Sequence, residues 1–397
     1  MDFTFPKEYQ LLRRMIREFA QREIAPIARK IDEEEEIPRE LIDKMARLGL
    51  LGVYFPQKYG GMGAGEMGYC ILMEEMDRVC GSTATFLGTH IGIGAMAIYV
   101  DGNEEQKQKY LTPLARGEKI AAFGLTEPGA GSDAAAIKTR AERDGDYYIL
   151  NGTKIFISNG GIADIFSVLA VTDPSLGARG GVTAFIVEKD FPGFSIGSLE
   201  EKMGIRGTST AELVFEDCPV PRENVIGEVG LGFVTFMETL DINRLSLGAA
   251  CLGAAQAALD ASVKWAKVRQ QFGKPIAHKQ SIQFMIADMS IEIEALRSLI
   301  YRTAWLVDTG RPFLREGAIC KVYASEVLHR CVDRAVQIHG GMGYMHGYPI
   351  ERMYRDARIT EIFEGTSEIQ RFVIASDIFR QAGVRISPTV GKIFDFL

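Results

Sequence analysis

The sequence predicts an α+β protein of three domains, expected at residues 1–121 (helical), 122–231 (antiparallel β) and 232–397 (a helical bundle). Three observations predict this order. Apolar residues recur at helical spacing up to about residue 120, short β-rich runs bounded by Gly, Pro and Asp follow, and helical spacing returns from about Gly232. A chain of 397 residues is long enough for two or three domains with a large core.

The first region carries a clear amphipathic pattern near its start. Apolar residues at i, i+3, i+4, i+7 and i+8 predict one buried helix face, made of Leu12, Met15, Ile16, Phe19 and Ala20. The acidic run at 33–36, followed by Pro38, predicts a turn and the start of a new helix.

The second region contains a hairpin signal. The runs 147–150 and 154–158 are rich in β-forming residues, and Asn151-Gly152 lies between them. Because Asn-Gly is favoured where both turn residues need positive φ, we predict a β-hairpin that turns at this pair. Further β-rich runs at 166–171, 182–187 and 211–215 have separators mostly too short for crossover helices, so we expect an antiparallel barrel or sandwich.

The third region predicts several long helices. Two faces have helical spacing, one with Ile282, Met285, Ile286, Met289 and Ile293 and the other with Ile319, Val322, Tyr323 and Val327. Breaks are predicted at Gly273-Lys-Pro275 and Gly310-Arg-Pro312. Long helices with short breaks are typical of a bundle.

The composition excludes several classes of function. A net charge of −7 argues against nucleic-acid binding, and no apolar run approaches the roughly 20 residues that cross a bilayer. The N-terminus has neither a signal-peptide nor a transit-peptide pattern. Six scattered cysteines without a C-x-x-C pair favour a reducing compartment, so a cytoplasmic location is expected. The five histidines lack metal-ligand spacing, and no metal is expected.

Two segments carry the strongest chemical signals. Gly365 would let the backbone approach a ligand closely, and the carboxylate of Glu364 before it could act as a base if burial raised its pKa. A solvated Glu beside a loop glycine is the alternative. The stretch 123–133 concentrates glycines and hydroxyls, which let backbone N–H groups reach a phosphate or a flat ring, although most such loops are only turns.

Three weaker signals lie in the helical region. Asp241 and Arg244 share a helix face, either as part of a site or as an exposed ion pair. The planar guanidinium of Arg269, near a helix end, suits a pyrophosphate or simply complements the helix dipole. Gly340 and Gly341 either cap a helix or approach an anion.

Taken together and in this order, the motifs resemble the acyl-CoA dehydrogenase family, with the short-chain, butyryl-type branch as the closest match. The resemblance is carried by Leu125-Thr-Glu-Pro-Gly-Ala-Gly-Ser-Asp133, Asn151-Gly-Thr-Lys154, Arg269-x-x-Phe-Gly273, Gln337-x-x-Gly-Gly341 and Arg355-Asp-Ala-Arg-Ile-Thr-Glu-Ile-Phe-Glu-Gly-Thr366. It implies an N-terminal helical domain, a middle β-domain, a C-terminal four-helix bundle, non-covalent FAD and a homotetramer built from dimers. It also implies oxidation of an acyl-CoA thioester to the 2-enoyl-CoA, with an electron-transferring flavoprotein as the acceptor.

The resemblance assigns roles residue by residue. Glu364 matches the base that removes the α-proton, while the position that holds the base in some branches is here Asn243, which cannot ionise. FAD contacts are implied for Phe123, Leu125, Thr126, Gly131, Ser132, Phe156, Ile157, Ser158, Arg269, Gln271, Phe272, Gln280, Gln337, Gly340, Gly341, Thr366 and Glu368, some of them across a subunit boundary. Substrate contacts are implied for Ser132, Asp241, Arg244 and Gly365. Many relatives have Trp and Thr where this chain has Phe156 and Ser158.

The implied chemistry needs the enolate to be stabilised as the α-proton leaves. We expect the Glu364 N–H and a ribityl hydroxyl of FAD to donate to the thioester oxygen, and the β-hydride to move to flavin N5. Leu247, Phe363 and residues 89–93 are expected to set the depth of the acyl pocket, and short, branched and cyclic acyl groups all stay open. An acyl-CoA oxidase that uses O2, a non-catalytic FAD-binding scaffold and an enzyme that reduces enoyl-CoA are the alternatives.

Overall fold

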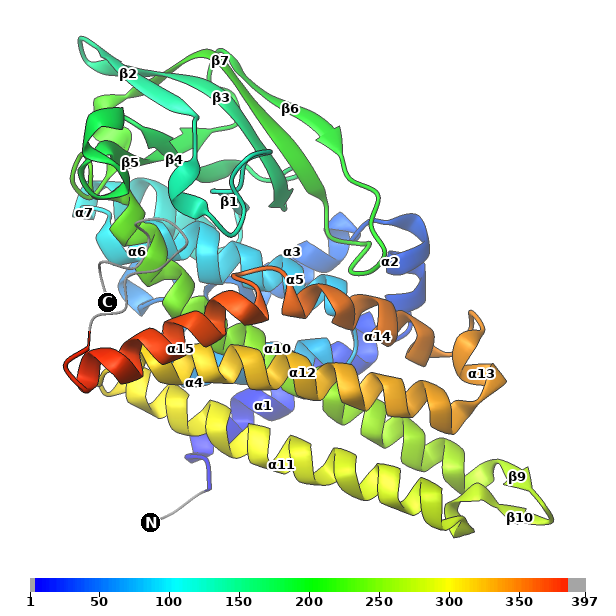
Figure 1. The fold of residues 1–397 in the computed structure, drawn as a ribbon. Coiled ribbons are helices and arrows are strands. Elements are labelled where there is room, and N and C mark those ends of the chain that lie inside the picture. Colours follow the sequence, from blue (N-terminus) through cyan, green and yellow to red (C-terminus); the bar gives the residue numbers. More distant parts are fainter. Residues whose placement is uncertain (1–3, 385–397) are drawn as a thin grey trace.

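The computed structural model describes residues 4–384 and places the strands on one side of a set of long helices (Figure 1). Residues 1–3 and 385–397, the outer ends of the first and third expected domains, lie outside the described residues. The boundaries expected after residues 121 and 231 stay predictions.

The first region is helical, as predicted. Its helices are α1 (Lys7–Phe19), α2 (Ala28–Glu34), α3 (Arg39–Arg47), α4 (Gly65–Asp77), α5 (Gly81–Leu87), α6 (Met96–Asp101), α7 (Glu104–Gln106) and α8 (Thr112–Ala115). The amphipathic face of α1 is confirmed, because Ile16 and Phe19 are buried and Leu12 packs against the core. The turn after the acidic run is also confirmed: Glu35 has a left-handed φ of 58°, and α3 begins directly after Pro38.

Helices α5 and α6 are joined by a π-helical segment, η4 (Gly88–Ala95). The expectation that no apolar run approaches the length that crosses a bilayer is wrong, because the combined run Gly81–Asp101 is long and apolar enough by length and composition alone. However, 78% of its apolar window is buried inside the protein. This run is therefore a core helix that packs beside the sheet and the third region.

The second region forms one sheet, made of β1 (Ala121–Gly124), β2 (Arg140–Asp144), β3 (Tyr147–Ser158), β4 (Ile165–Val171), β5 (Val182–Glu188), β6 (Phe194–Leu199), β7 (Thr210–Pro221) and β8 (Val225–Ile226). The strand order is β6-β7-β3-β2-β4-β5-β8, with β1 paired to β4. Pairing is antiparallel except where β4 meets β1 and the end of β2. A short helix, α9 (Ala178–Gly181), precedes β5.

The predicted hairpin at Asn151-Gly152 is wrong. Strand β3 continues through both residues, and the chain turns earlier, at Gly145, between β2 and β3. The Asn151 side chain bonds Asp217 of β7 twice, at 3.1 and 2.9 Å. Gly152 lies at a register shift with φ 146°, where a Cβ would come within 2.6 Å of Thr139 Oγ1. A β-bulge therefore uses the residue pair that also favours a tight turn.

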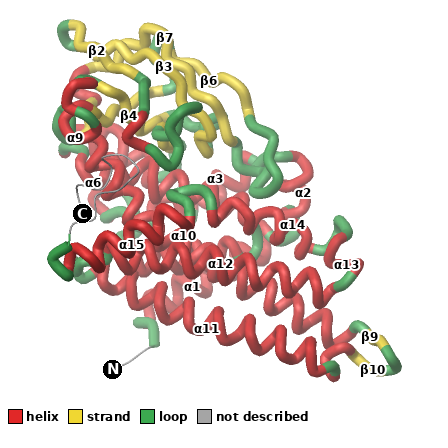
Figure 2. Tube along the Cα trace, viewed as in Figure 1, coloured by secondary structure: helices red, strands yellow, loops and turns green. Residues whose placement is uncertain are grey.

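The third region contains α10 (Gly232–Val268), α11 (Gln280–Asp308), α12 (Leu314–His339), α13 (Gly341–Tyr344), α14 (Pro349–Ala357) and α15 (Ser367–Gln381). The break near Gly273 holds two short strands, β9 (Gln270–Gln271) and β10 (Lys274–Pro275), and the break at Gly310 separates α11 from α12. Both predicted breaks are confirmed. The long helices run below the sheet, and the β9–β10 hairpin projects from one end of them (Figure 2).

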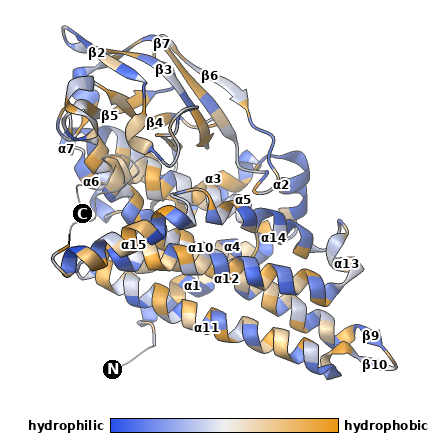
Figure 3. Cartoon of the chain, viewed as in Figure 1, coloured by the Kyte–Doolittle hydropathy of each residue, from blue (hydrophilic) through white to orange (hydrophobic). Residues whose placement is uncertain are grey.

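The apolar core is continuous between the regions. Hydrophobic and hydrophilic residues alternate around the long helices (Figure 3), and one buried cluster contains Ile91, Phe123 and Phe236 from the three regions. The rings of Phe123 on β1 and Phe236 on α10 stack with centroids 4.1 Å apart. This contact fixes the sheet against α10 beside the cavity described next.

Candidate active site

A cavity of about 730 Å³ lies between the sheet and the third region. Its walls come from the loop after β1, the end of β3, helix α10 and the segment before α15, together with α4, α5 and η4 of the first region. It brings together the predicted residues Phe123, Leu125, Thr126, Gly131, Ser132, Phe156, Ile157, Ser158, Arg244, Glu364, Gly365 and Thr366. Thr89, Ile93, Leu247 and Phe363, expected to set the acyl pocket, line the same cavity.

Glu364 is held by an unusual backbone conformation. Both Glu364 and Gly365 have left-handed φ values, 55° and 88°, and this region is rare for a glutamate. Two contacts hold the segment on α15: Thr366 Oγ1 accepts the Ile369 N–H at 3.2 Å, and Gln370 Nε2 donates to the Glu364 carbonyl at 3.0 Å. A Cβ at position 365 would clash with Gln370 Nε2, so this turn requires glycine.

The two carboxylate oxygens of Glu364 have different surroundings. Oε1 accepts a hydrogen bond from Asn243 Nδ2 at 2.7 Å, whereas Oε2 is buried and has no hydrogen-bond partner among the described residues. Burial raises the pKa of Glu364 to about 7, against the opposing effects of Lys321, Arg244 and the Asn243 hydrogen bond. A carboxylate with a pKa near neutrality is suited to accept a proton.

A buried ion pair fixes the glycine-rich loop to the sheet. Lys154 Nζ on β3 donates to Glu127 Oε1 at 2.7 Å and to the Leu125 carbonyl at 3.2 Å. Glu127 also accepts the N–H groups of Lys138 and Thr139, at 2.6 and 3.0 Å. Burial lowers the pKa of Lys154 to about 8 even with Glu127 beside it. The pair joins two of the sequence motifs and fixes the wall that carries Thr126 and Ser132.

The end of β3 presents an aromatic side chain to the cavity. The pairing of β3 with β7 shifts register between Lys154 and Ile157, and Phe156 there has a left-handed φ of 58°. Its side chain is 60% exposed although it lines the cavity. Gly131, which lines the same cavity, is exposed, and a Cβ there would meet no atom within 4 Å.

A second group of predicted residues lies away from this cavity. Arg269, Gln271, Phe272 and Gln280 lie around the β9–β10 hairpin, and Gln337, Gly340 and Gly341 lie near the end of α12 (Figure 1). Helix α10 lines the cavity as far as Ala254, and the 14 residues from there to Val268 extend about 21 Å further at about 1.5 Å each. One chain therefore does not bring both groups to one site.

The two remaining predicted residues flank the cavity. Asp241 forms an ion pair with Arg244 one turn away on α10, and burial raises the pKa of Asp241 to about 6. Glu368 is exposed in the first turn of α15.

The sequence did not reveal several polar groups around Glu364. Tyr69 and Ser246 contact the Asn243 side chain, and Lys321 is a fully buried lysine whose charge acts on Glu364. Burial lowers the pKa of Lys321 to about 8, and its Nζ has no hydrogen-bond partner within residues 4–384. In the sequence, the one available signal for such a group was a lysine within an apolar helix face.

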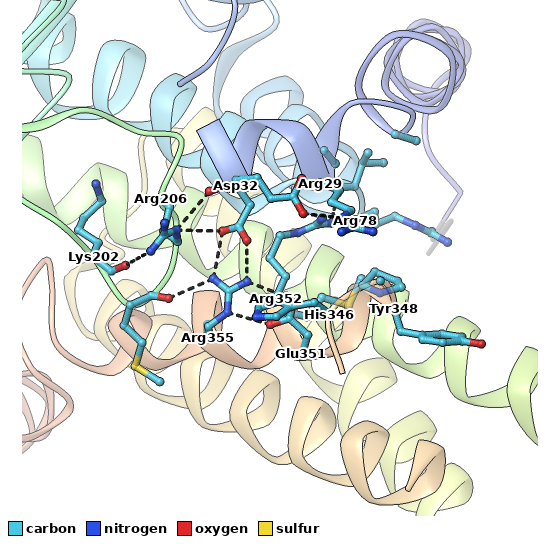
Figure 4. A pocket seen from close by; sticks show the side chains of 18 of the residues that line it. Arg29, Asp32, Arg78, Lys202, Arg206, His346, Tyr348, Glu351, Arg352 and Arg355 are labelled. Atoms are coloured by element: carbon cyan, nitrogen blue, oxygen red, sulfur yellow. Dashed lines mark hydrogen bonds and ion pairs between the residues drawn. The ribbon is translucent and has the colours of Figure 1, made fainter. Parts of the chain in front are cut away.

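A second cavity, of about 940 Å³, is lined by many arginines (Figure 4). Arg355 of α14 binds Asp32 of α2 at 2.6 Å and Glu351 at 2.9 Å. Arg206, from the loop between β6 and β7, donates to the Asp32 carbonyl at 3.2 Å and points toward the same aspartate (Figure 4). These contacts join one element from each of the three regions, so we interpret this cluster as structural.

The described residues contain no group of three or more His, Cys, Asp or Glu side chains that could hold a metal ion. All six cysteines are buried and free.

Comparison with known proteins agrees with this site. Residues 6–118, 122–218 and 230–379 match the N-terminal, middle and C-terminal domains of acyl-CoA dehydrogenase. The chain belongs to the acyl-CoA dehydrogenase family. A short-chain specific acyl-CoA dehydrogenase of Clostridium acetobutylicum is 49% identical over 96% of this chain and 100% of its own length. An acryloyl-CoA reductase (NADH) of Anaerotignum propionicum is also 49% identical, over 96% of this chain and 97% of its own.

A solved structure supports the cofactor. An acyl-CoA dehydrogenase from Bacillus anthracis, complexed with FAD, superposes with a TM-score of 0.90 at 40% identity and covers 96% of this chain and 68% of that one. The protein is thus an FAD-dependent oxidoreductase of this family, as the sequence predicted. Its cavity has room for a flat cofactor, because the volume is about 730 Å³ and the Phe156 ring that lines it is uncovered.

Proposed function

We propose that this protein dehydrogenates a short-chain, branched or cyclic acyl-CoA, with Glu364 as the base. The α C–H bond breaks and its proton passes to Glu364 Oε2, the β C–H bond breaks with its electron pair, and a C=C bond forms. When bound, FAD supplies the acceptor for that hydride. The observation that carries the proposal is Oε2, which is buried, unpaired among the described residues and beside the cavity.

The remaining contacts, to the flavin, the thioester and the CoA portion, are assigned to residues around this cavity. We assign the flavin contacts to the β3 segment 156–158, the loop from Phe123 to Ser132, and Thr366. Ser132 and Gly365 would meet the thioester, and Asp241 with Arg244 would meet the CoA portion. The Glu364 N–H would donate to the enolate oxygen, a contact that contributes about 3 kcal/mol in comparable sites.

The second group of predicted FAD residues requires another copy of the chain. Arg269 and Gln337 lie too far along the bundle to reach the cavity of their own subunit, so we propose that they contact FAD across a subunit boundary. Large apolar side chains near that end support an interface: Phe272 is 91% exposed and Tyr344 is 79% exposed. We propose a homotetramer built from dimers, as the family resemblance implies.

The remaining partners follow from the same resemblance. We propose an electron-transferring flavoprotein as the acceptor that reoxidises FAD. We also propose a cytoplasmic location, which six free thiols support.

The test compares Glu364→Gln with the wild type and with Glu361→Gln. Glu361 is a matched control because it lies three residues earlier and contacts Arg358 and His329 instead of the cavity. A panel of acyl-CoAs is added anaerobically to each FAD-loaded protein, and bleaching of the flavin absorbance is followed. Glu364→Gln is expected to bind FAD and acyl-CoA but lose at least about 100-fold in rate, since a positioned base contributes about 10²–10⁴-fold. Rapid bleaching by this variant would disprove the role of Glu364.

Reduction of an enoyl-CoA is the second candidate, because the acryloyl-CoA reductase is as similar to this chain as the dehydrogenase is. Rapid reoxidation of the reduced flavin by an enoyl-CoA, with little bleaching by any acyl-CoA, would favour this direction. Release of hydrogen peroxide without an added acceptor would instead favour an oxidase.

A further inference from the structure

We propose that Asn243 is a positioning residue that favours the ionised form of the Glu364 carboxylate and directs Oε2 toward the substrate. The inference rests on the proposed function of Glu364 and extends it to the side chain that binds its other oxygen. The sequence indicated only that Asn243 cannot itself be a base.

The first step is the hydrogen bond between the two side chains. Asn243 Nδ2 donates to Glu364 Oε1 at 2.7 Å, and Asn243 is only 1% exposed. A buried N–H donor favours the charged form of a carboxylate, because the bond is stronger to an anion than to a neutral acid. Since Oε1 is engaged, Oε2 is the oxygen left to accept a proton.

The second step is the orientation of the amide. Asn243 Oδ1 lies 2.8 Å from Ser246 Oγ and 3.1 Å from the Tyr69 hydroxyl. Each hydroxyl carries one proton, which it shares between Oδ1 and a nearby main-chain carbonyl, that of Asn243 itself or of Gly88. These hydroxyls fit either orientation of the amide, because each can donate to its carbonyl and accept from an N–H, so the Glu364 carboxylate decides that Nδ2 faces it. The reversed amide would place two acceptor oxygens against each other whenever Glu364 is ionised.

The third step is the packing that holds this network. Gly92 of η4 lies against the amide, and a Cβ there would clash with Asn243 Oδ1 and approach Tyr69 Oη within 2.5 Å. Helices α4 and α10 and the η4 segment therefore enclose the side chain on the side away from Glu364. An enclosed amide keeps one position, which a positioning residue requires.

Other charged and titratable groups also face Glu364. Lys321 of α12 and Arg244 of α10 favour its ionised form, as Asn243 does. Tyr69 of α4 and Cys251 of α10 are buried, and burial raises the pKa of each, so both are neutral near pH 7. Replacing the Asn243 side chain therefore leaves both cations in place. We expect the midpoint of the Glu364 titration to shift, while Glu364 still ionises.

The experiment measures the protonation of Glu364 directly in the FAD-loaded protein. In pH-dependent infrared difference spectra, the carboxylic acid band of Glu364 is the one that Glu364→Gln removes. Its midpoint is compared in the wild type, Asn243→Ala and Asn243→Asp. Thr239→Val serves as the matched control, because Thr239 is also buried on α10 and its hydroxyl bonds only the Thr235 carbonyl among the described residues.

In Asn243→Ala, we expect the midpoint to rise by about one pH unit. A hydrogen bond to a charged group stabilises that charge by about the free energy that corresponds to one pKa unit. A shift from about 7 to about 8 would lower kcat/KM about fivefold at pH 7 and leave it nearly unchanged at pH 9. In Asn243→Asp, which keeps the shape of the side chain, two carboxyl groups share a proton and the upper midpoint should rise further. Thr239→Val should leave the midpoint in place.

The outcomes separate this inference from the proposed function. If Glu364→Gln keeps its turnover, the assignment of the base is wrong, whatever the Asn243 variants do. If Glu364→Gln is inactive but both Asn243 variants keep the wild-type midpoint, the inference about Asn243 alone is wrong. A lower melting temperature of Asn243→Ala without a shifted midpoint would also contradict it.

Discussion

Replacing Glu364 with Gln is expected to stabilise the fold at alkaline pH. The folded state raises the pKa of this carboxyl group from 4.5 to about 7, chiefly through burial, so it binds the proton more tightly than the unfolded chain does. The resulting stabilisation is complete below pH 4.5 and is lost as the pH rises to about 7. Glutamine keeps the shape of the side chain and has no charge to bury, so the variant avoids this loss.

The magnitude follows from the shift. A pKa difference of about 2.5 units means that the wild type loses about 3 kcal/mol of unfolding free energy as the pH rises from below 4.5 to above 7. Less than about 1 kcal/mol of this is already lost at pH 5. Urea unfolding of wild type and Glu364→Gln, matched in FAD content, at pH 5 and pH 8 measures the difference. The advantage of the variant should grow by about 2–3 kcal/mol between the two pH values.

An advantage of equal size at pH 5 and pH 8 would refute the reasoning, because it would mean that folding does not perturb Glu364. A confirmed pH dependence would show that the fold gives up stability to keep a carboxylate in the cavity. Such a trade between stability and activity is common at sites that bury charge.

Two further changes test other parts of the structure. Gly92→Ala is expected to displace the Asn243 amide and to destabilise the protein by about 1–3 kcal/mol through overpacking. The melting temperature should fall and the titration midpoint of Glu364 should shift. An unchanged melting temperature would contradict the packing described. Arg355→Met removes the two hydrogen bonds that Arg355 donates to the Asp32 carboxylate and leaves Arg206 as its cation, so it should cost about 1.5–3 kcal/mol of unfolding free energy. The loss should shrink when Asp32 is replaced by Asn in the same protein.

The sequence predicted the order of the three regions because helical and strand periodicities differ strongly there. It failed at Asn151-Gly152, where a β-bulge and a tight turn favour the same residues. The motif around Glu364 predicted a carboxylate beside a glycine. The contacts of Asn243 with Tyr69 and Glu364 join residues 174 and 121 positions apart, so no local pattern predicts them. Their proximity follows from the packing of α4, α10 and α15.

The position of Asp32 has a consequence for how the molecule melts. The carboxylate of Asp32 binds Arg355 of α14 and its carbonyl group accepts a hydrogen bond from Arg206 of the β6–β7 loop, so neither neighbour can detach without losing a contact to α2. The three regions are therefore not expected to unfold independently at the boundaries between them. Heating should release the whole assembly of helices and strands in a single cooperative transition rather than one layer after another.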